Sequence, residues 1–336
     1  MNGHQNEAFS CLTGALNDLR KVNGYGADYA KTFKNMIDIL LATFNGEKFL
    51  DSQISSILYQ TFEDWHLIIH DDGSTDRTVE IIKSWVEKDS RIEYVEDGVL
   101  CKDAAKNFMH LLKYSGSDYI MFCDQDDIWF DNKVEFLFEE INHMDDSKPR
   151  VVYSNSYVWK PNKGIIGKGT ISFASEIRKL LFFNCGVQGC ASIFDAKTRD
   201  LLKQYTGVLS MHDHLLNLLA VSVCQCHFVD LALMLYRNHE HNVTGSTRTE
   251  LFTFNNVFGN IHFPIINKMH YLTVQNFYST YSEELSEYDK KLIVDYLSMP
   301  QKSFVSKLIT IIKNGYVIWN SHILLILKLF VRPYMR

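Results

Sequence analysis

The sequence predicts an α/β fold in which a mainly parallel sheet carries helices on both faces, followed by a helical segment at the carboxyl end. Two observations lead to this prediction. Short apolar runs alternate along the first half with segments whose apolar residues recur at helical spacing, which is the pattern of β-α-β units. The length of 336 residues suits one large α/β domain with an appendage, and 46% hydrophobic residues is an ordinary share for a globular core.

The first half supplies the regular part of this pattern. Strands are expected at 36–42, 66–70, 91–95 and 118–123, and helices over 49–58, from Thr75 or Asp76 as the cap, over 102–114 and over 132–144. A helix between successive strands lets neighbouring strands run in the same direction. We therefore expect a nucleotide-binding type of domain, with its ligand at the carboxyl ends of the strands.

The second half, from Val151, is less regular. A strand is expected near 151–153, a loop rich in Gly and Lys over 161–170, a helix around 175–183, helices from Ala196 and Asp213, and a strand over 228–236. The chain is therefore divided into an extension at 1–34, a main domain at 35–245 with halves at 35–150 and 151–245, and a helical segment at 246–336. The extension is expected to be poorly ordered.

Charge, cysteines and missing motifs exclude several classes of protein. A net charge of −6 without a basic, aromatic strip argues against nucleic-acid binding. Seven Cys without C-x-x-C spacing indicate reduced thiols and a cytoplasmic location, and residues 1–34 lack the apolar core of a signal peptide. Because neither a G-x-x-x-x-G-K-[ST] loop nor a dinucleotide-binding Gly pattern occurs, P-loop and hydride-transfer chemistry are disfavoured.

The residues suited to chemistry gather at three strand ends. They are Thr43-Phe44-Asn45, the run Asp71 to Asp76, and Asp124-Gln125-Asp126. In a parallel sheet these loops converge on one edge. Phe44 offers a ring on which a base can stack, and Asp72 can accept a hydrogen bond from a base N–H. The alternative for 71–76 alone is a tight turn with a helix cap, which leaves the second acidic strand end unexplained.

The second acidic strand end predicts a cation site. Clustered carboxylates repel one another and are driven towards protonation unless a cation compensates them. Oxygen ligands with few His or Cys nearby suit Mg²⁺ or Mn²⁺, usually shared with a substrate phosphate. We expect Asp124 and Asp126 to hold the ion. For an isolated D-x-D motif, a solvated acidic loop would be the better interpretation.

The first half resembles the inverting glycosyltransferases of family two, which have the GT-A fold. Four motifs within about residues 36–140 carry the resemblance: Ile39 to Gly46, Ser56 to Phe62, Asp71 to Thr78, and Asp124 to Trp129. It implies a catalytic domain at 35–245 whose first half binds a nucleotide sugar. The residues implied for this binding are Thr43, Phe44, Asn45, Asp72 and Asp124, with Asp126 as the main metal ligand. The family usually has Tyr in place of Phe44, so stacking is retained and a hydroxyl contact is lost.

The second half resembles the rhamnosyltransferase branch of that family and is expected to bind the acceptor. The shared residues are Gly189-Cys190-Ala191, His212-Asp213-His214 and Tyr236-Arg237-Asn238-His239, with Asn242 and Gly245. Branch members commonly carry an aromatic residue soon after the His-Asp pair, where this chain has Leu215 and Leu216. This departure bears on the donor sugar more than on the reaction.

Asp213 is the candidate general base. Inversion needs one base that takes the proton of the acceptor hydroxyl. Asp213 lies at a predicted helix start, far in sequence from the metal-binding acids, and the alternative is a helix N-cap. His239 is expected to contact the diphosphate or the metal, and Arg237 to neutralise phosphate charge, with a structural role as the alternative for both. His212 and His214 are more simply explained as structural.

The carboxyl end has an unusual composition. From Gln301 onward there are six basic residues and no acidic one, and two apolar runs lie between them. The longest uncharged stretch, 314–327, is shorter than the roughly 20 residues of a spanning helix. Such a segment is expected to lie against an anionic membrane surface. The alternative is a pair of terminal helices that pack on the domain with snorkelling Lys.

These expectations combine into one hypothesis. The chain would transfer a sugar, best matched by L-rhamnose from dTDP-L-rhamnose, to a hydroxyl of a lipid-linked or growing surface polysaccharide. It would use Mg²⁺ or Mn²⁺ and act at the cytoplasmic face of the inner membrane. One alternative is a sugar-1-phosphate nucleotidyltransferase, disfavoured because 43–48 is not a Gly-rich, basic loop. The other is a non-catalytic sugar-nucleotide-binding protein, disfavoured by the intact acids.

Overall fold

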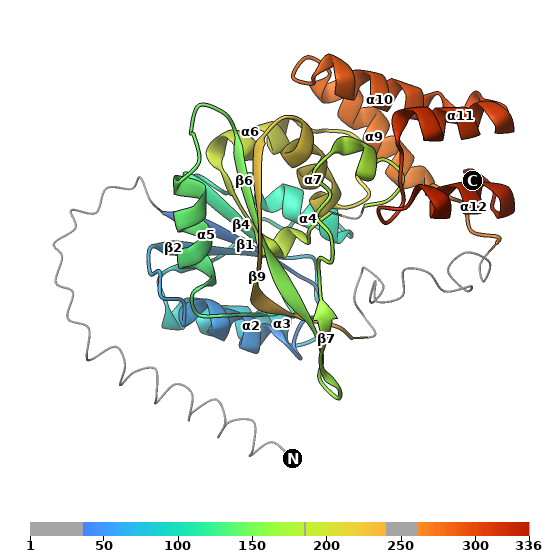
Figure 1. The fold of residues 1–336 in the computed structure, drawn as a ribbon. Coiled ribbons are helices and arrows are strands. Elements are labelled where there is room, and N and C mark those ends of the chain that lie inside the picture. The colour runs from blue at the N-terminus through green and yellow to red at the C-terminus, as the bar shows by residue number, and fades with distance from the viewer. Residues whose placement is uncertain (1–35, 185, 240–260, 336) are drawn as a thin grey trace. The chain divides into compact units, whose positions relative to one another are not determined.

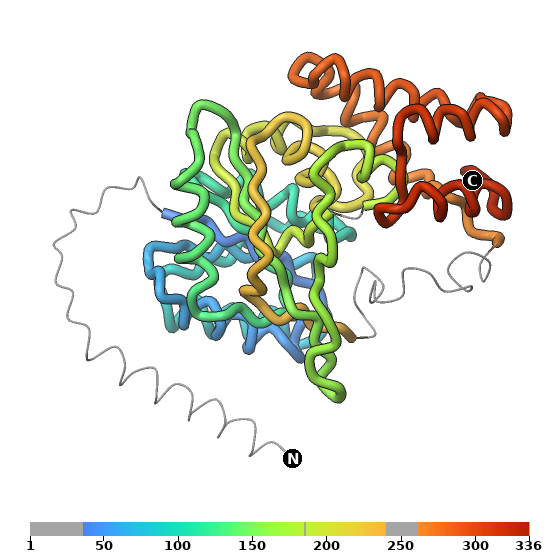
Figure 2. The backbone as a smooth tube through the Cα atoms, in the orientation of Figure 1, coloured from blue at the N-terminus to red at the C-terminus, as the bar shows by residue number. Residues whose placement is uncertain are grey.

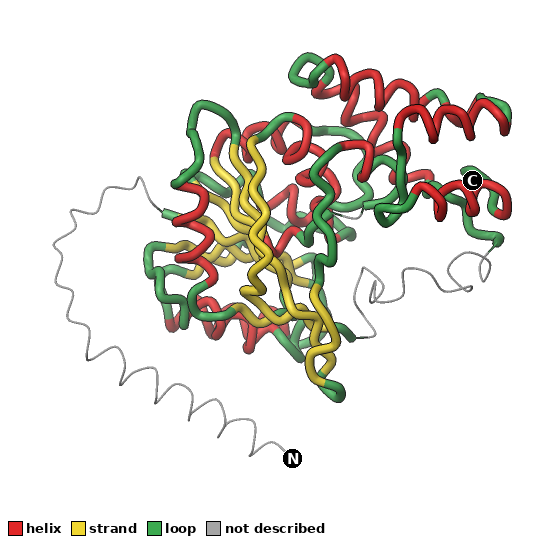
Figure 3. Tube along the Cα trace, in the orientation of Figure 1, coloured by secondary structure: helices red, strands yellow, loops and turns green. Residues whose placement is uncertain are grey.

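The computed structural model describes residues 36–184, 186–239 and 261–335, so the extension 1–34, Asn242 and Gly245 lie outside the described residues. Within those ranges the chain forms a nine-stranded sheet in the order β3-β2-β1-β4-β8-β6-β9-β5, with β7 paired to β6 (Figure 3). The strands are β1 (Ile37–Thr43), β2 (Trp65–Asp71), β3 (Ile92–Tyr94), β4 (Tyr119–Asp124), β5 (Ile128–Trp129), β6 (Arg150–Lys160), β7 (Gly164–Lys168), β8 (Ser192–Asp195) and β9 (Gln225–Arg237).

The first four strands form the parallel part of the sheet. Strand β1 pairs in parallel with both β2 and β4, and β2 pairs in parallel with β3. The register sets Thr43 opposite Asp71, and Ala42 opposite Asp124. The α/β fold and the common edge predicted for the three strand ends are therefore confirmed. Antiparallel β8 then joins β4 to β6, and β6 runs beside β9 along most of its length (Figure 2).

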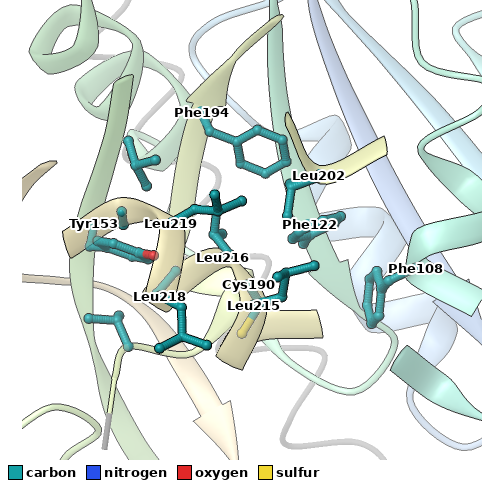
Figure 4. Close-up of a cluster of buried hydrophobic side chains, with 14 of the residues drawn as sticks. Phe108, Phe122, Tyr153, Cys190, Phe194, Leu202, Leu215, Leu216, Leu218 and Leu219 are labelled. Carbon is teal, nitrogen blue, oxygen red and sulfur yellow. The ribbon is translucent and has the colours of Figure 1, made fainter. Parts of the chain in front are cut away.

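Helices cover both faces of the sheet (Figure 1). Those of the main domain are α2 (Leu50–Leu58), α3 (Thr78–Lys88), α4 (Ala104–Leu111), α5 (Lys133–Asn142), α6 (Ala196–Gln204) and α7 (His212–Ser222). Helix α4 packs on β1, β2 and α7, whereas α5 packs on β6 and β8. Helix α7 is buried along nearly its whole length, because leucines lie on every side of its middle and the polar His212, His214 and Asn217 are buried with them. Its leucines Leu215, Leu216, Leu218 and Leu219 pack among Phe122, Tyr153 and Phe194, which fixes the first turn of α7 against the sheet (Figure 4).

Two local predictions in the second half are wrong. The segment 161–170 is not only a loop, since Gly164–Lys168 forms β7 as a hairpin partner of β6. The segment 175–183 contains only one short 3₁₀ turn, Ile177–Lys179. Its apolar residues are consecutive and buried on all sides, so they do not define one helical face. The Leu181 carbonyl also accepts a hydrogen bond from His270 Nε2 (2.8 Å), a partner outside any local helix.

Within the ranges that the structure describes, four α-helices follow the main domain: α9 (Lys268–Tyr281), α10 (Glu287–Leu297), α11 (Phe304–Asn314) and α12 (His322–Val331). They join the same hydrophobic core, and the Tyr281 hydroxyl donates to the Leu201 carbonyl (2.7 Å). Among the described residues, no helix has both the length and the apolar content required to cross a bilayer.

Candidate active site

A cavity of about 820 Å³ lies at the carboxyl ends of β1, β2 and β4. This volume is within the ordinary range of ligand pockets. Of the predicted site residues, those that line it are Thr43, Phe44, Asn45, Asp72, Asp124, Asp126, Asp213 and His239. The three strand-end loops thus share one cavity with the first turn of α7. Arg237 is not among the lining residues.

Thr43 and Asn45 join the first two loops. Thr43 Oγ1 donates to Asp71 Oδ1 (2.8 Å), and Asn45 Oδ1 accepts from the Thr75 amide (2.9 Å). The Asn45 amide donates to Ser74 Oγ (2.7 Å). Asp71 also accepts from the Ser74 amide (2.7 Å), as in the tight turn considered for this run. These hydrogen bonds hold the two loops together and so fix the shape of this part of the cavity wall.

Phe44 is held from the third loop by Gln125, a contact that sequence reasoning missed. Gln125 Oε1 accepts from the Phe44 amide, and Gln125 Nε2 donates to the Phe44 carbonyl, both at 2.9 Å. A Cβ at Gly46 would lie 2.3 Å from Gln125 Oε1, so only glycine leaves room for this contact. The Phe44 ring remains 54% exposed. A large exposed aromatic side chain on a fixed backbone is suited to stacking against a planar ligand.

The Asp72 carboxylate connects two segments that line the cavity. Its oxygens accept from the backbone amides of Lys102 (2.8 Å) and Asp103 (3.0 Å). This contact joins the end of β2 to the loop that precedes α4. Because Asp72 lines the cavity and each carboxylate oxygen can accept more than one hydrogen bond, it can still bind a ligand N–H there.

The acids after β4 form a tightly coupled group. Burial, reinforced by the charge of Asp126, raises the pKa of Asp124 to about 7. Burial also raises the pKa of Asp127 well above its usual range, and no group in the described part of the chain forms a hydrogen bond with the buried Asp127 Oδ2. Lys133 lies fully buried beside this group with its Nζ 3.5 Å from the Trp129 ring centroid, and burial lowers its pKa to about 8. Lys133 and Arg237, whose guanidinium also interacts with Asp126 and Asp127, supply two positive charges against three carboxylates.

The acidic group therefore fits a cation. Among the described residues, donor atoms of Asp124, Asp127 and Cys190 lie within 4.8 Å of one another. Asp126 instead accepts from His239 Nε2, at 2.7 Å, which brings two predicted residues together. Oxygen ligands predominate in this set, and it can hold a hard divalent cation.

Arg237 supports this loop from behind. Its guanidinium lies between the rings of Phe49 (4.6 Å) and Trp159 (4.5 Å), and its Nε donates to the Asp126 carbonyl (2.7 Å). Its backbone amide donates to Asp127 Oδ1 (3.0 Å). The described contacts of Arg237 thus position the acidic loop.

Asp213 lies in the first turn of α7, with Met211 as the N-cap residue. The N-cap alternative for Asp213 is therefore wrong. Asn184 Nδ2 donates to Asp213 Oδ1 (3.0 Å), a second contact that sequence reasoning missed. A Cβ at Gly189 would lie 2.7 Å from His212 Nε2, so this glycine allows the start of α7 to approach the cavity. Asp213 thus lines the cavity, and the hydrogen bond from Asn184 orients its carboxylate.

Comparison with known proteins agrees with this geometry. The family described as Glycosyl transferase family 2 matches residues 38–205, half of the chain. The glucosyltransferase WfgD of Escherichia coli, named for transfer from UDP-Glc to α-D-GlcNAc-diphosphoundecaprenol, is 34% identical over 47% of this chain. The match spans only 59% of that relative's length. The dTDP-rhamnosyl transferase RfbG of Shigella flexneri is 29% identical over 61% of this chain and 74% of its own.

Solved structures share the fold. A crystal structure of S. aureus TarS in complex with UDP-GlcNAc aligns with a TM-score of 0.51 and 17% sequence identity. The alignment covers 78% of this chain and 71% of that chain. The fold is accordingly of the GT-A type, as the sequence predicts.

Proposed function

Because the chain belongs to glycosyl transferase family 2, we propose that it transfers one sugar from a nucleoside diphosphate to a hydroxyl group, with inversion at the anomeric carbon. The observation that carries this proposal is the single cavity that holds the three strand-end loops together with Asp213. Residues 35–150 would bind the donor and residues 151–245 the acceptor, with the remainder of the chain as the helical segment 246–336.

The donor would bind along the β1–β4 edge. Its base would stack on Phe44 and donate an N–H to Asp72, while Thr43 and Asn45 shape the wall beneath it. Asp124 would face the ribose and the diphosphate. Our best candidate for the donor is dTDP-L-rhamnose, supported by the dTDP-rhamnosyl transferase relative. UDP-glucose is the competing donor, since it is named for two other relatives.

Asp124 and Asp126 would hold Mg²⁺ or Mn²⁺. Asp124 belongs to the cluster with Asp127 and Cys190, and Asp126 lines the same cavity, where His239 orients its carboxylate. Such an ion supplies charge stabilisation for the leaving diphosphate. Arg237 would assist diphosphate binding in two ways. It positions the acidic loop, and its positive charge would attract the diphosphate.

Asp213 would act as the base. The acceptor oxygen attacks the anomeric carbon, the bond from that carbon to the diphosphate oxygen breaks, and the hydroxyl proton passes to the Asp213 carboxylate. Asn184 would keep the carboxylate directed at the acceptor.

The acceptor would be a lipid-linked saccharide. Two relatives are named for an acceptor linked through diphosphate to undecaprenol. An enzyme that uses such an acceptor works at a membrane surface, and we place this chain at the cytoplasmic face as a peripheral protein.

The proposal is tested with the purified full-length chain, Mn²⁺ or Mg²⁺, and a panel of nucleotide sugars. We expect metal-dependent release of nucleoside diphosphate from one donor, raised by a lipid-linked acceptor. Asp126→Ala should reduce this release at least about 100-fold, because the charge of the leaving group loses its support. Asp200→Ala, which removes an exposed carboxylate of α6, is the matched control. Release of pyrophosphate from a nucleoside triphosphate, or donor binding without any turnover, would contradict the proposal.

A second prediction concerns Gln125. Gln125→Glu replaces the Nε2 donor with an oxygen that repels the Phe44 carbonyl, so the loop that carries the ring loses its support. We expect about tenfold weaker binding of the nucleoside diphosphate, measured by calorimetry, with a smaller effect on kcat. Gln204→Glu makes the same charge change at the exposed end of α6 and should bind normally. Unchanged affinity in Gln125→Glu would show that Phe44 needs no such support.

A further inference from the structure

Helices α11 and α12 carry an exposed apolar face that nothing in the described part of the chain covers. The face consists of Val305, Ile309, Ile312, Ile323, Leu327 and Phe330. On each helix its members follow the same i, i+4, i+7 spacing, which aligns them along one side. All but Leu327 are at least 59% exposed. We propose that this apolar face docks on the surface of an anionic lipid bilayer.

The two stripes meet where α12 contacts α11. Helices α11 and α12 pack side by side (Figure 1), and the rings of Phe304 and Phe330 meet with their centroids 4.8 Å apart. The opposite sides of both helices are in the protein core, where Ile311, Leu324 and Leu325 are fully buried. The apolar face is therefore held by a packed scaffold. Contiguous exposed apolar area of this kind marks an interaction site.

Charge identifies the partner as anionic. No acidic residue occurs from Gln301 to the end of the chain. Lys313 is exposed directly beside Ile312, and Lys307 and Arg332 are partly exposed on the same two helices. In a symmetric dimer through this face, these cations would be brought towards their own copies and would repel. Anionic headgroups attract them, while the acyl chains accept the apolar side chains.

The depth of docking follows from helix length. Helix α11 has 11 residues and α12 has 10, about half of what spans a bilayer. Both helices present their apolar side chains on one side only. This geometry suits insertion to the level of the headgroups and the first part of the acyl chains.

A short series of contacts connects this region with the cavity. Lys328 of α12 lies with its Nζ 4.6 Å from the ring centroid of Trp319, and the Trp319 ring contacts Phe183 (5.5 Å between centroids). The next residue, Asn184, donates to Asp213. The docked helices would thus place the acceptor side of the cavity close to the bilayer, where a lipid-linked saccharide is found. This inference deepens the membrane placement proposed above, but it stands on the contacts of α11 and α12 and needs no particular donor.

The test measures co-sedimentation of the full-length chain with vesicles. We expect binding to vesicles of phosphatidylcholine with phosphatidylglycerol, and much weaker binding to phosphatidylcholine alone. The variant Ile309→Gln/Ile312→Gln/Ile323→Gln should bind the mixed vesicles at least about tenfold more weakly, since three exposed apolar side chains are lost. The matched control Ile165→Gln/Ile171→Gln/Val294→Gln removes three exposed apolar side chains elsewhere and should bind as the unaltered chain does.

Several outcomes would overturn the proposal. These are no vesicle binding by the unaltered chain, equal binding by the first triple variant with its circular dichroism unchanged, or a dimer that this variant abolishes in the absence of vesicle binding. Equal binding to both vesicle types would refute the role of anionic headgroups. Nucleoside diphosphate release is measured separately without vesicles. If that release fails while vesicle binding persists, the proposed transfer reaction is refuted and the docking face stands.

Discussion

Replacing Asp213 by asparagine is expected to lower the rate of sugar transfer by about 10²–10⁴-fold, the usual contribution of a positioned general base. The amide cannot take up the acceptor proton. Its oxygen can still accept the hydrogen bond from Asn184, so the geometry of the first turn of α7 should be retained. Nucleotide binding should be unchanged, because the donor contacts lie on the β1–β4 edge. The loss should therefore appear in kcat and not in the affinity for the donor.

The measurement is formation of the glycosylated acceptor by Asp213→Asn at saturating donor and metal. Nucleoside diphosphate affinity is measured by calorimetry on the same sample. Asp200→Asn, at an exposed position of α6, makes the same chemical change outside the cavity and should be fully active. If Asp213→Asn retained full activity, another group would have to take the proton.

The site residues that lie at the ends of strands were predictable from the sequence. Thr43, Asp71 and Asp124 each follow an apolar run, and the parallel register then brings them to one edge. The partners of these residues were not predictable. Gln125 forms hydrogen bonds with Phe44, which lies 81 positions away in the sequence. Asn184 forms one with Asp213, which lies 29 positions away. Such contacts depend on the packing of whole elements, and no local pattern encodes them.

The same limit explains the errors in the second half. A helix was expected around 175–183. Leu180 and Leu181 are both fully buried, however, so consecutive residues pack into the core and no single helical face is defined. The start of α7 was predicted within one residue, but its cap is Met211. From the sequence alone, an N-cap role for Asp213 remained an alternative, because Asp commonly occupies that position. The structure assigns that position to the first turn.

Stability should fall steeply in acid because three histidines are buried in neutral form around α7. Burial lowers the pKa of His212 to about 3 and that of His270 to about 4, and it holds the pKa of His214 well below its usual range. His214 and His270 stack with their centroids 4.2 Å apart, so their cations would repel. The unfolded chain binds protons at these histidines from about pH 6.5 downwards, whereas the folded chain does not. Each histidine therefore contributes stability that is lost as the pH falls below about 6.5.

Protonation of Asp124 and Asp127 has the opposite effect on stability, because their raised pKa values favour the folded state in acid. The variant His270→Gln isolates the contribution of one histidine from that effect. Glutamine can still donate to the Leu181 carbonyl but does not titrate. Between about pH 7.5 and pH 5, the unaltered chain should lose about 2 kcal/mol more unfolding free energy than His270→Gln. Urea denaturation at both pH values measures this difference, with exposed His143→Gln as the control. An equal loss in both chains would mean that His270 is protonated in the folded state, and then the stacked histidines would have to share a proton.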